Sequence, residues 1–176
     1  MIEWSALAGI TALIVYGVVI YNRLVRDRQR TRAGWSDIEV QLKRRHDLIP
    51  KLVDAVKQYA AYEQATLDQV TALRSRAGDM RAATQQGRLE TDISQNLVTI
   101  FALQEAYPEL KANQSFLQLQ TDISNVEADI QFARRYYNGA VRNLNTRIET
   151  FPDLLVARIF AYRQAQYFEL EATVQQ

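Results

Sequence analysis

Residues 116–144 read FLQLQTDISNVEADIQFARRYYNGAVRNL and carry the clearest periodic pattern in the chain. Apolar side chains return there every three or four positions, which is the spacing of one face of an α-helix. They are Phe116, Leu119, Ile123, Val126, Ile130, Ala133, Tyr137, Ala140 and Leu144. Because a proline disfavours helical geometry in the residue before it, the pattern predicts a long amphipathic helix that breaks at Phe151-Pro152.

A second, shorter helix is predicted upstream of this one. One face of it carries four residues at helical spacing, Leu89, Ile93, Leu97 (or Asn96) and Ile100. It ends near Tyr107, because Pro108 follows. Gly78 and Gly87 bracket a polar stretch, which we interpret as the turn before this helix.

Residues 35–77 predict another long helix, of about 43 residues or roughly 65 Å. Its two heptad rows read Trp35, Leu42, Ile49, Val56, Glu63, Val70, Ala77 and Ile38, Arg45, Leu52, Tyr59, Thr66, Leu73. Ser36 and Glu39 have capping-box form, so the helix is expected to begin there, with Gly34 as a flexible point before it. Pro50 should bend this helix without breaking it, because the apolar spacing continues in phase across it.

After Pro152, Asp153 is expected to cap a short last helix. That helix would carry Leu154, Leu155, Ile159, Phe160, Tyr167 and Phe168. With no strand pattern in the sequence, residues 35–176 predict an all-α, elongated antiparallel bundle of two long and two shorter helices. The shorter helices cannot cover the long ones along their full length. We therefore expect exposed faces and a homo-oligomer.

The N-terminal segment predicts a transmembrane anchor in residues 1–21. From Trp4 to Tyr21 it reads WSALAGITALIVYGVVIY, without a charged residue, and spans about 27 Å as a helix. A cleaved signal peptide should begin with positive charge and end at small residues, and this segment does neither. A buried core helix would show a broader polar face. We therefore expect an uncleaved helix in contact with membrane lipid.

A basic juxtamembrane segment follows in residues 22–34. Asp27 is the one acid among five arginines, Arg23, Arg26, Arg28, Arg30 and Arg32. The positive-inside rule then places the N-terminus outside and the soluble domain in the cytoplasm. The same arginines could bind anionic headgroups. A net charge of only +1 gives no general affinity for nucleic acid.

Candidate chemistry is sparse. The absence of cysteine excludes disulfides, thiolate nucleophiles and Cys-bound metals. His46, the single histidine, lies beside Asp47 and could be a general base, but a structural role is favoured because no nucleophile stands at a recognisable spacing. The carboxylates Glu63, Glu105, Glu127 and Glu169 lack the Glu-x-x-His pairs of di-iron bundles. We therefore assign no catalytic, cofactor-binding or metal residue.

Two features invite more than one interpretation. Glu63 falls on an apolar heptad row, where it is either a helix-edge residue or a group that sets the register of a bundle or interface. Tyr136, Tyr137 and Asn138 are either ordinary core packing or a core layer together with its polar rim.

Several segments together resemble the LemA family, over nearly the whole chain. They are Tyr21-Asn22, Leu24-Val25, Trp35-Ser36-Asp37-Ile38, Val40 to Pro50, Leu52-Val53, Val56-Lys57, Tyr59-Ala60 with Glu63, Tyr107-Pro108, Leu110-Lys111-Ala112, Ala133-Arg134, Tyr137-Asn138, Phe151-Pro152 and Tyr167-Phe168-Glu169. Four positions, in three places, depart from the family pattern. Lys51 replaces a usual asparagine and Gln58 a usual glycine, and Phe160-Ala161-Tyr162 replaces Phe-Gly-Phe. Without the usual glycine, the sequence gives less support for a special backbone geometry at Ala161.

The resemblance implies a bacterial membrane-anchored helical bundle, with no established activity and no catalytic residues to transfer. The leading hypothesis is a non-enzymatic scaffold that self-assembles or docks partners. The alternative is an adaptor of a neighbouring membrane protease or hydrolase, since such genes often lie beside those of the family. An enzyme that uses His46 ranks last.

Overall fold

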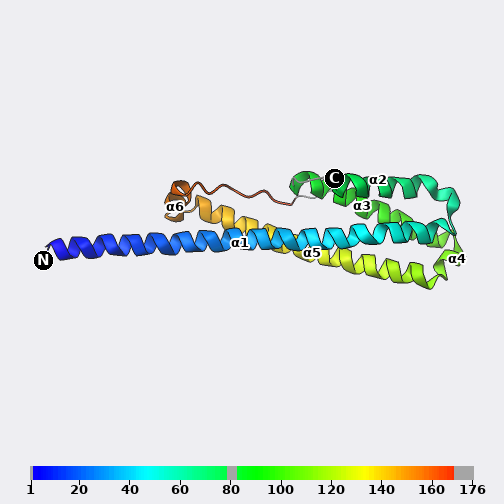
Figure 1. The fold of residues 1–176 in the computed structure, drawn as a ribbon, viewed down its shortest axis with the longest axis horizontal. Helices are drawn as coiled ribbons and strands as arrows, with labels where there is room; N and C mark the ends of the chain where they lie inside the picture. The colour runs from blue at the N-terminus through cyan, green and yellow to red at the C-terminus, as the bar shows by residue number, and fades with distance from the viewer. Residues whose placement is uncertain (1, 79–82, 169–176) are drawn as a thin grey trace, which may run out of the picture. The chain divides into compact units, whose positions relative to one another are not determined.

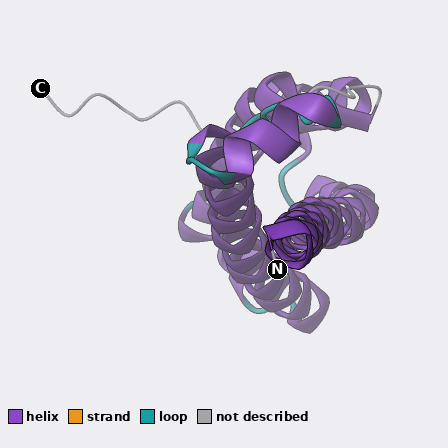
Figure 2. Ribbon diagram, turned by 90° about the vertical axis from the view of Figure 1, so that its left-hand side faces the viewer, coloured by secondary structure: helices purple, strands orange, loops and turns teal. Residues whose placement is uncertain are grey.

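The computed structural model describes the backbone of residues 2–78 and 83–168, and in these ranges it contains helices and loops but no strand (Figures 1 and 2). The α-helices are α1 (Ile2–Lys57), α2 (Gln64–Gly78), α3 (Ala83–Ala102), α4 (Pro108–Lys111), α5 (Gln114–Glu149) and α6 (Asp153–Ile159). Two short 3-10 helices are also present: η1 (Ala61–Glu63) lies between α1 and α2, and η2 (Leu103–Glu105) lies between α3 and α4. The all-α prediction is confirmed. The expected turn after Gly78 lies partly outside the described residues, and Gly87 falls inside α3.

The chain divides into two compact units, and both α1 and α5 contribute to each. We call residues 1–36 with 135–166 the anchor unit, and residues 37–134 with 167–176 the four-helix unit.

The four-helix unit is built from the apolar faces of α1, α2, α3 and α5. Figure 1 shows α2 and α3 running side by side. The core consists of Ile49, Leu52, Val53, Val56, Ala60, Leu67, Val70, Leu73, Ala77, Leu89, Ile93, Leu97, Ile100, Leu110, Phe116 and Ile123. The predicted apolar face of the second helix is thus buried as a whole. The long helix predicted over 116–144 is confirmed as α5.

The single helix predicted over 35–77 is wrong. α1 ends at Lys57, and the backbone N–H groups of Tyr59 and Ala60 donate to the carbonyl of Val56 at 3.0 and 2.8 Å before α2 begins at Gln64. Both α1 and α2 line the same core, so the apolar rhythm stays in phase through the turn. Gln58 is the first residue after α1.

The predicted helix start at Ser36 is also wrong, because α1 continues through it from Ile2. Gly34 is helical, and a Cβ added there would lie 3.0 Å from Tyr136 Cδ1 and 3.1 Å from Tyr137 Cα. Its role is therefore close helix approach and not flexibility. Pro50 lies inside α1 without breaking it, as predicted, and Ile49, Leu52 and Val56 share one core.

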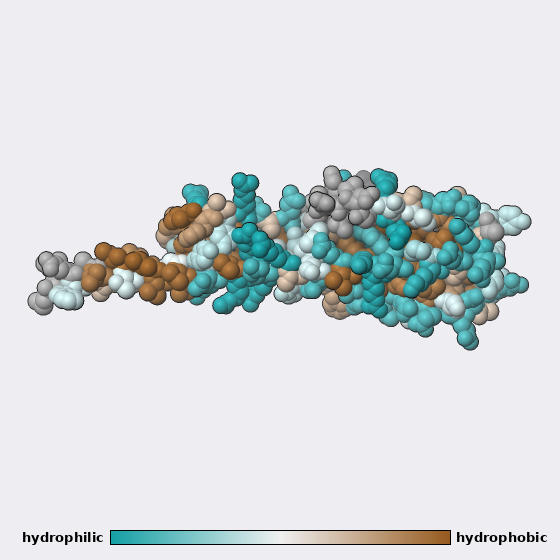
Figure 3. Space-filling model, in the orientation of Figure 1, coloured by the Kyte–Doolittle hydropathy of each residue, from teal (hydrophilic) through white to brown (hydrophobic). Residues whose placement is uncertain are grey.

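The anchor unit has its own small core of α1, α5 and α6. Ile20 and Leu24 pack with Leu144, Ile148 and Ala157. By length and composition, α1 is the one helix in the described part of the chain that could cross a membrane. Figure 3 shows the apolar surface of its N-terminal stretch.

The last predicted helix is shorter than expected. α6 ends at Ile159, so Tyr167 and Phe168 lie outside it. Pro152 is its N-cap residue and Asp153 its first helical residue, so the predicted cap at Asp153 is wrong, and the carboxylate of Asp153 instead accepts a hydrogen bond from Arg147 at 2.9 Å. The segment after α6 is fastened to α5 by the amide of Asn145, which donates to the carbonyl of Ala165 at 3.0 Å and accepts from its N–H at 2.9 Å.

Candidate functional site

The largest fully buried polar side chain in the described residues is Arg45 of α1, in the four-helix unit. Its Nη1 donates to Ser94 Oγ at 2.8 Å and to Glu127 Oε1 at 2.6 Å. Its Nη2 donates to the carboxylate of Glu90 and, at 3.3 Å, to the backbone carbonyl of Glu90. One guanidinium therefore connects α1, α3 and α5. We call Arg45, His46, Glu90, Ser94 and Glu127 the charge cluster.

Glu90 is the buried acid of the charge cluster, with 4% of its surface exposed. Burial raises its pKa, but the bond from His46 and the charge of Arg45 outweigh burial, so the pKa of Glu90 lies below its ordinary value of 4.5. His46 Nε2 lies 3.1 Å from Glu90 Oε1. A carboxylate with a lowered pKa is a weak general base, because catalysis favours a pKa near the operating pH.

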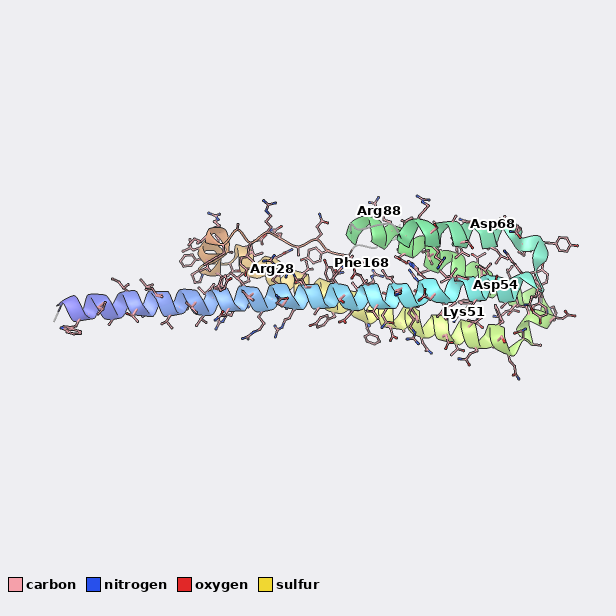
Figure 4. All side chains as sticks on the ribbon, in the orientation of Figure 1. Arg28, Lys51, Asp54, Asp68, Arg88 and Phe168 are labelled. Atoms are coloured by element: carbon pink, nitrogen blue, oxygen red, sulfur yellow. The ribbon has the colours of Figure 1, made fainter. Side chains whose placement is uncertain are left out.

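Arg134 closes one side of the charge cluster. Its guanidinium lies 5.1 Å from the ring centre of Phe168, a buried side chain labelled in Figure 4. Burial and the charge of Arg45 lower the pKa of Arg134, and Glu127 partly opposes them. The cavity lined by Arg45, Glu90, Glu127, Arg134 and Phe168 has a volume of about 90 Å³. Ligand sites usually exceed 300 Å³, so this cavity is too small for an organic substrate.

The structure brings two of the sequence candidates together and separates the others. His46 and Glu127 both belong to the charge cluster. Glu63 instead accepts a hydrogen bond from the hydroxyl of Tyr107 at 3.2 Å, and burial and then Glu63 raise the pKa of Tyr107. Glu105 is exposed, with Lys111 at 4.0 Å. Glu169 lies outside the described residues. No group of three His, Asp or Glu side chains in the described ranges is arranged to hold a metal.

Sequence reasoning missed Arg45, Glu90, Ser94 and Arg134. One signal was present, since Arg45 stands on an apolar heptad row. A charge on a core row requires a buried partner, because an unpaired buried charge is costly. The partners themselves lie 45 and 82 positions away in sequence, and no local pattern identifies them.

A second ionic arrangement lies in the anchor unit. Asp27 is 5% exposed, and its Oδ2 accepts from Arg147 Nε at 2.6 Å. Arg147 also donates to Asp153 at 2.9 Å, and the bond to Asp27, against some burial, raises the pKa of Arg147. Asp27, the one acid among the five juxtamembrane arginines, is therefore paired with Arg147 of α5.

The two adjacent tyrosines of the anchor unit, Tyr136 and Tyr137, differ in burial. Tyr137 is buried, its ring lies 5.4 Å from that of Trp35, and its hydroxyl donates to the carbonyl of Gln166 at 2.8 Å. Burial raises the pKa of Tyr137. Tyr136 is 53% exposed and covers Gly34. Tyr137 thus belongs to a core layer, and Tyr136 to its rim.

Comparison with known proteins gives one consistent result. The model of the LemA family matches residues 34–176. A protein named LemA from Metamycoplasma hominis is 31% identical over 131 residues, which are 74% of this chain and 60% of that protein. Magnetosome protein MamQ 2 of Paramagnetospirillum magneticum is 25% identical over 187 residues, 92% of this chain and 69% of its own. The chain thus spans less than two thirds of the LemA relative. By the family match and this identity, the chain belongs to the LemA family.

Proposed function

We propose that this protein is a non-enzymatic, membrane-anchored helical scaffold that self-associates in the bacterial inner membrane. The observation that carries the proposal is the N-terminal stretch of α1. From Trp4 to Val19 its described residues are exposed, apart from the half-buried Gly17, although the stretch has no charged residue. Apolar surface of this extent is stable in lipid and not in water.

The orientation follows from the arginines. Arg23, Arg26, Arg28 and Arg30 are exposed, and the single acid among them, Asp27, is shared between Arg147 and Arg30, so positive charge exceeds negative charge in this segment. Positive residues of this kind are retained on the cytoplasmic side. The helical units would therefore lie in the cytoplasm.

The charge cluster supports a structural role and not a catalytic one. Each charged group in it faces an opposite charge, and the cavity beside it is small. Buried ionic groups of this kind can fix the register of packed helices.

Self-association is supported by the surface of the anchor itself. A groove runs along one face, lined by Trp4, Leu7, Ala8, Thr11, Ala12, Val15, Tyr16 and Val19. The small side chains Ala8, Thr11 and Ala12 lie between bulky ones, and small residues spaced by four let membrane helices approach closely. Confinement to a membrane raises the effective concentration, so a modest interface is sufficient.

A cysteine pair tests this proposal, because the chain contains no cysteine of its own. Ala12→Cys places a thiol in the groove, and Leu13→Cys places one on the opposite side of the helix. Oxidation of native membranes should cross-link Ala12→Cys into a dimer and leave Leu13→Cys monomeric. Equal cross-linking of both variants, or of neither, would contradict the proposal. A monomer that co-purifies with a protease or hydrolase would favour the adaptor alternative.

A further inference from the structure

Helix α6 has one buried side and one apolar exposed side. Ala157 is 1% exposed and packs with Ile20 of α1 and Leu144 of α5. Leu155 and Ile159, four residues apart, are 52% and 76% exposed. Phe151 before the helix and Phe160 after it are 73% and 55% exposed. Figure 3 shows this apolar surface over α6. An exposed cluster of four large apolar side chains is a mark of an interaction surface.

The end of α6 lies beside the end of the apolar stretch of α1. The ring centres of Phe160 and Tyr21 are 4.6 Å apart, and Tyr21 is the last residue of that stretch. A membrane crossed by the stretch would therefore have its boundary at the level of Phe160. Aromatic rings are enriched at this boundary, where the ring contacts both apolar chains and headgroups.

Basic side chains surround the exposed face. Arg28, labelled in Figure 4, lies 5.8 Å from the ring centre of Tyr162, three residues beyond α6. Arg158 and Arg163 are exposed on or just after α6, and Arg23 and Arg26 are exposed on α1. Apolar residues flanked by arginines are the composition of segments that lie in the headgroup layer of anionic membranes.

We propose that Phe151, Leu155, Ile159 and Phe160 form a docking face that inserts into the surface of the bilayer crossed by α1. The occupant of this face is the headgroup layer of a membrane that contains anionic phospholipid. The inference rests on the proposed membrane anchor, and it adds a second membrane contact, distant in sequence from the anchor. α6 then holds α5 against the membrane surface.

Site-specific labelling in a full chain reconstituted into nanodiscs tests the inference. The nanodiscs contain phosphatidylethanolamine and phosphatidylglycerol, with one chain per disc, and a nitroxide on the lipid headgroup or acyl chain serves as quencher. Single cysteines carry an environment-sensitive fluorophore at Ile159→Cys, at Leu13→Cys in the anchor, and at Val98→Cys. Val98 is the matched control, because it is an apolar residue of α3 with 68% exposure.

We expect the label at position 159 to shift to shorter wavelength and to be quenched by the headgroup nitroxide. The label at 13 should be quenched from the acyl chain, and the label at 98 by neither. If the label at position 13 is quenched while the label at position 159 behaves like the one at position 98, the inference about α6 is wrong and the proposed membrane anchor is still supported. If 13 is not quenched, the proposed anchor itself is wrong. A shift at 159 that requires two chains per disc would assign the face to a second copy and overturn the inference.

A double variant gives a second readout. Leu155→Glu with Ile159→Glu alters only exposed positions, so the helical content of the chain should be unchanged by circular dichroism. The headgroup quenching of a label at Phe151→Cys should fall to the level of the Val98 control. Unchanged quenching in this variant would contradict docking through this face.

Discussion

Ala161 ends α6 in a left-handed backbone conformation, with a φ of 51°. The N–H of Tyr162 donates to the carbonyl of Ala157 at 2.9 Å, and the N–H of Ala161 donates to that of Arg158 at 3.2 Å. These two bonds define a Schellman ending, whose left-handed residue is usually glycine. Alanine occupies this position, yet the backbone is left-handed, because the two hydrogen bonds require that conformation whichever residue stands there.

We predict that Ala161→Gly stabilises the protein. The left-handed conformation costs a residue with a Cβ about 1–2 kcal/mol, and the added freedom of glycine in the unfolded chain offsets about half of this gain. The net increase should be about 0.5–1 kcal/mol, seen as a higher melting temperature by circular dichroism. Ala128→Gly, at an exposed position inside α5, is the control and should destabilise by about 1 kcal/mol. A fall in melting temperature for Ala161→Gly would contradict the account.

Glu90 should make the stability of the protein depend on acid pH. Its pKa in the folded state lies below 4.5, so its contribution is complete above the unfolded pKa and is lost as pH falls through the folded pKa. Glu90→Gln should lower stability at neutral pH by about 2 kcal/mol, because Arg45 loses a charged partner. Its melting temperature should also fall less than that of the wild type as the medium is acidified from pH about 5 to about 3.

The exposed Glu105→Gln provides the control for this measurement, since its side chain is 74% exposed. It should reproduce the wild-type pH profile. If the melting temperature of Glu90→Gln falls with acid pH as that of the wild type does, Glu90 is not the source of the pH dependence.

For individual residues, the sequence predicted which side chains are buried better than it predicted their hydrogen-bond partners. The apolar face of α3 and the core position of Tyr137 followed from periodicity, because each depends on local spacing. The hydrogen bonds of Arg45 to Ser94 and Glu127 cross 49 and 82 positions, and local spacing carries no information on them.

Among the elements, the close packing of α1 against α5 in the anchor unit depends on Gly34. A Cβ there would meet Tyr136 at 3.0 Å and the backbone of Tyr137 at 3.1 Å, whereas one at Gly139 would meet nothing within 4 Å. Gly34→Leu should therefore destabilise the protein by about 2 kcal/mol through overpacking. Gly139→Leu should have no effect or stabilise it by up to about 1 kcal/mol through helix propensity. Equal changes in the melting temperatures of the two variants would contradict this assignment.

The boundaries of the elements were predictable where a proline or a change of pattern marks them. The break at Phe151 before Pro152 and the continuity of α1 through Pro50 are examples. The end of α1 at Lys57 was not predictable from the heptad rows. Periodicity reports which face is buried, and this face is the same on both sides of the turn. The segment after the turn at Ala161 is held by long-range contacts, among them the hydrogen bond from the amide of Asn145 to the carbonyl of Ala165.

For the whole molecule, the exposed juxtamembrane arginines predict the orientation in the membrane. A green fluorescent reporter fused after Gln176 should be fluorescent, and an alkaline phosphatase fused there should be inactive, because both report a cytoplasmic position. The variant with Arg23, Arg26, Arg28 and Arg30 all changed to Gln should raise the phosphatase activity. High phosphatase activity of the unaltered fusion would place the helical units outside the cytoplasm and contradict the orientation.

Self-association of the full chain is tested by its mass in mild detergent. Mass photometry or native mass spectrometry at micromolar concentration, with no second protein present, counts the chains in each particle. The account predicts particles of two or more chains, and a shift toward monomers for Ala12→Leu, which fills the groove of the anchor. A monodisperse monomer of the wild-type chain would contradict it.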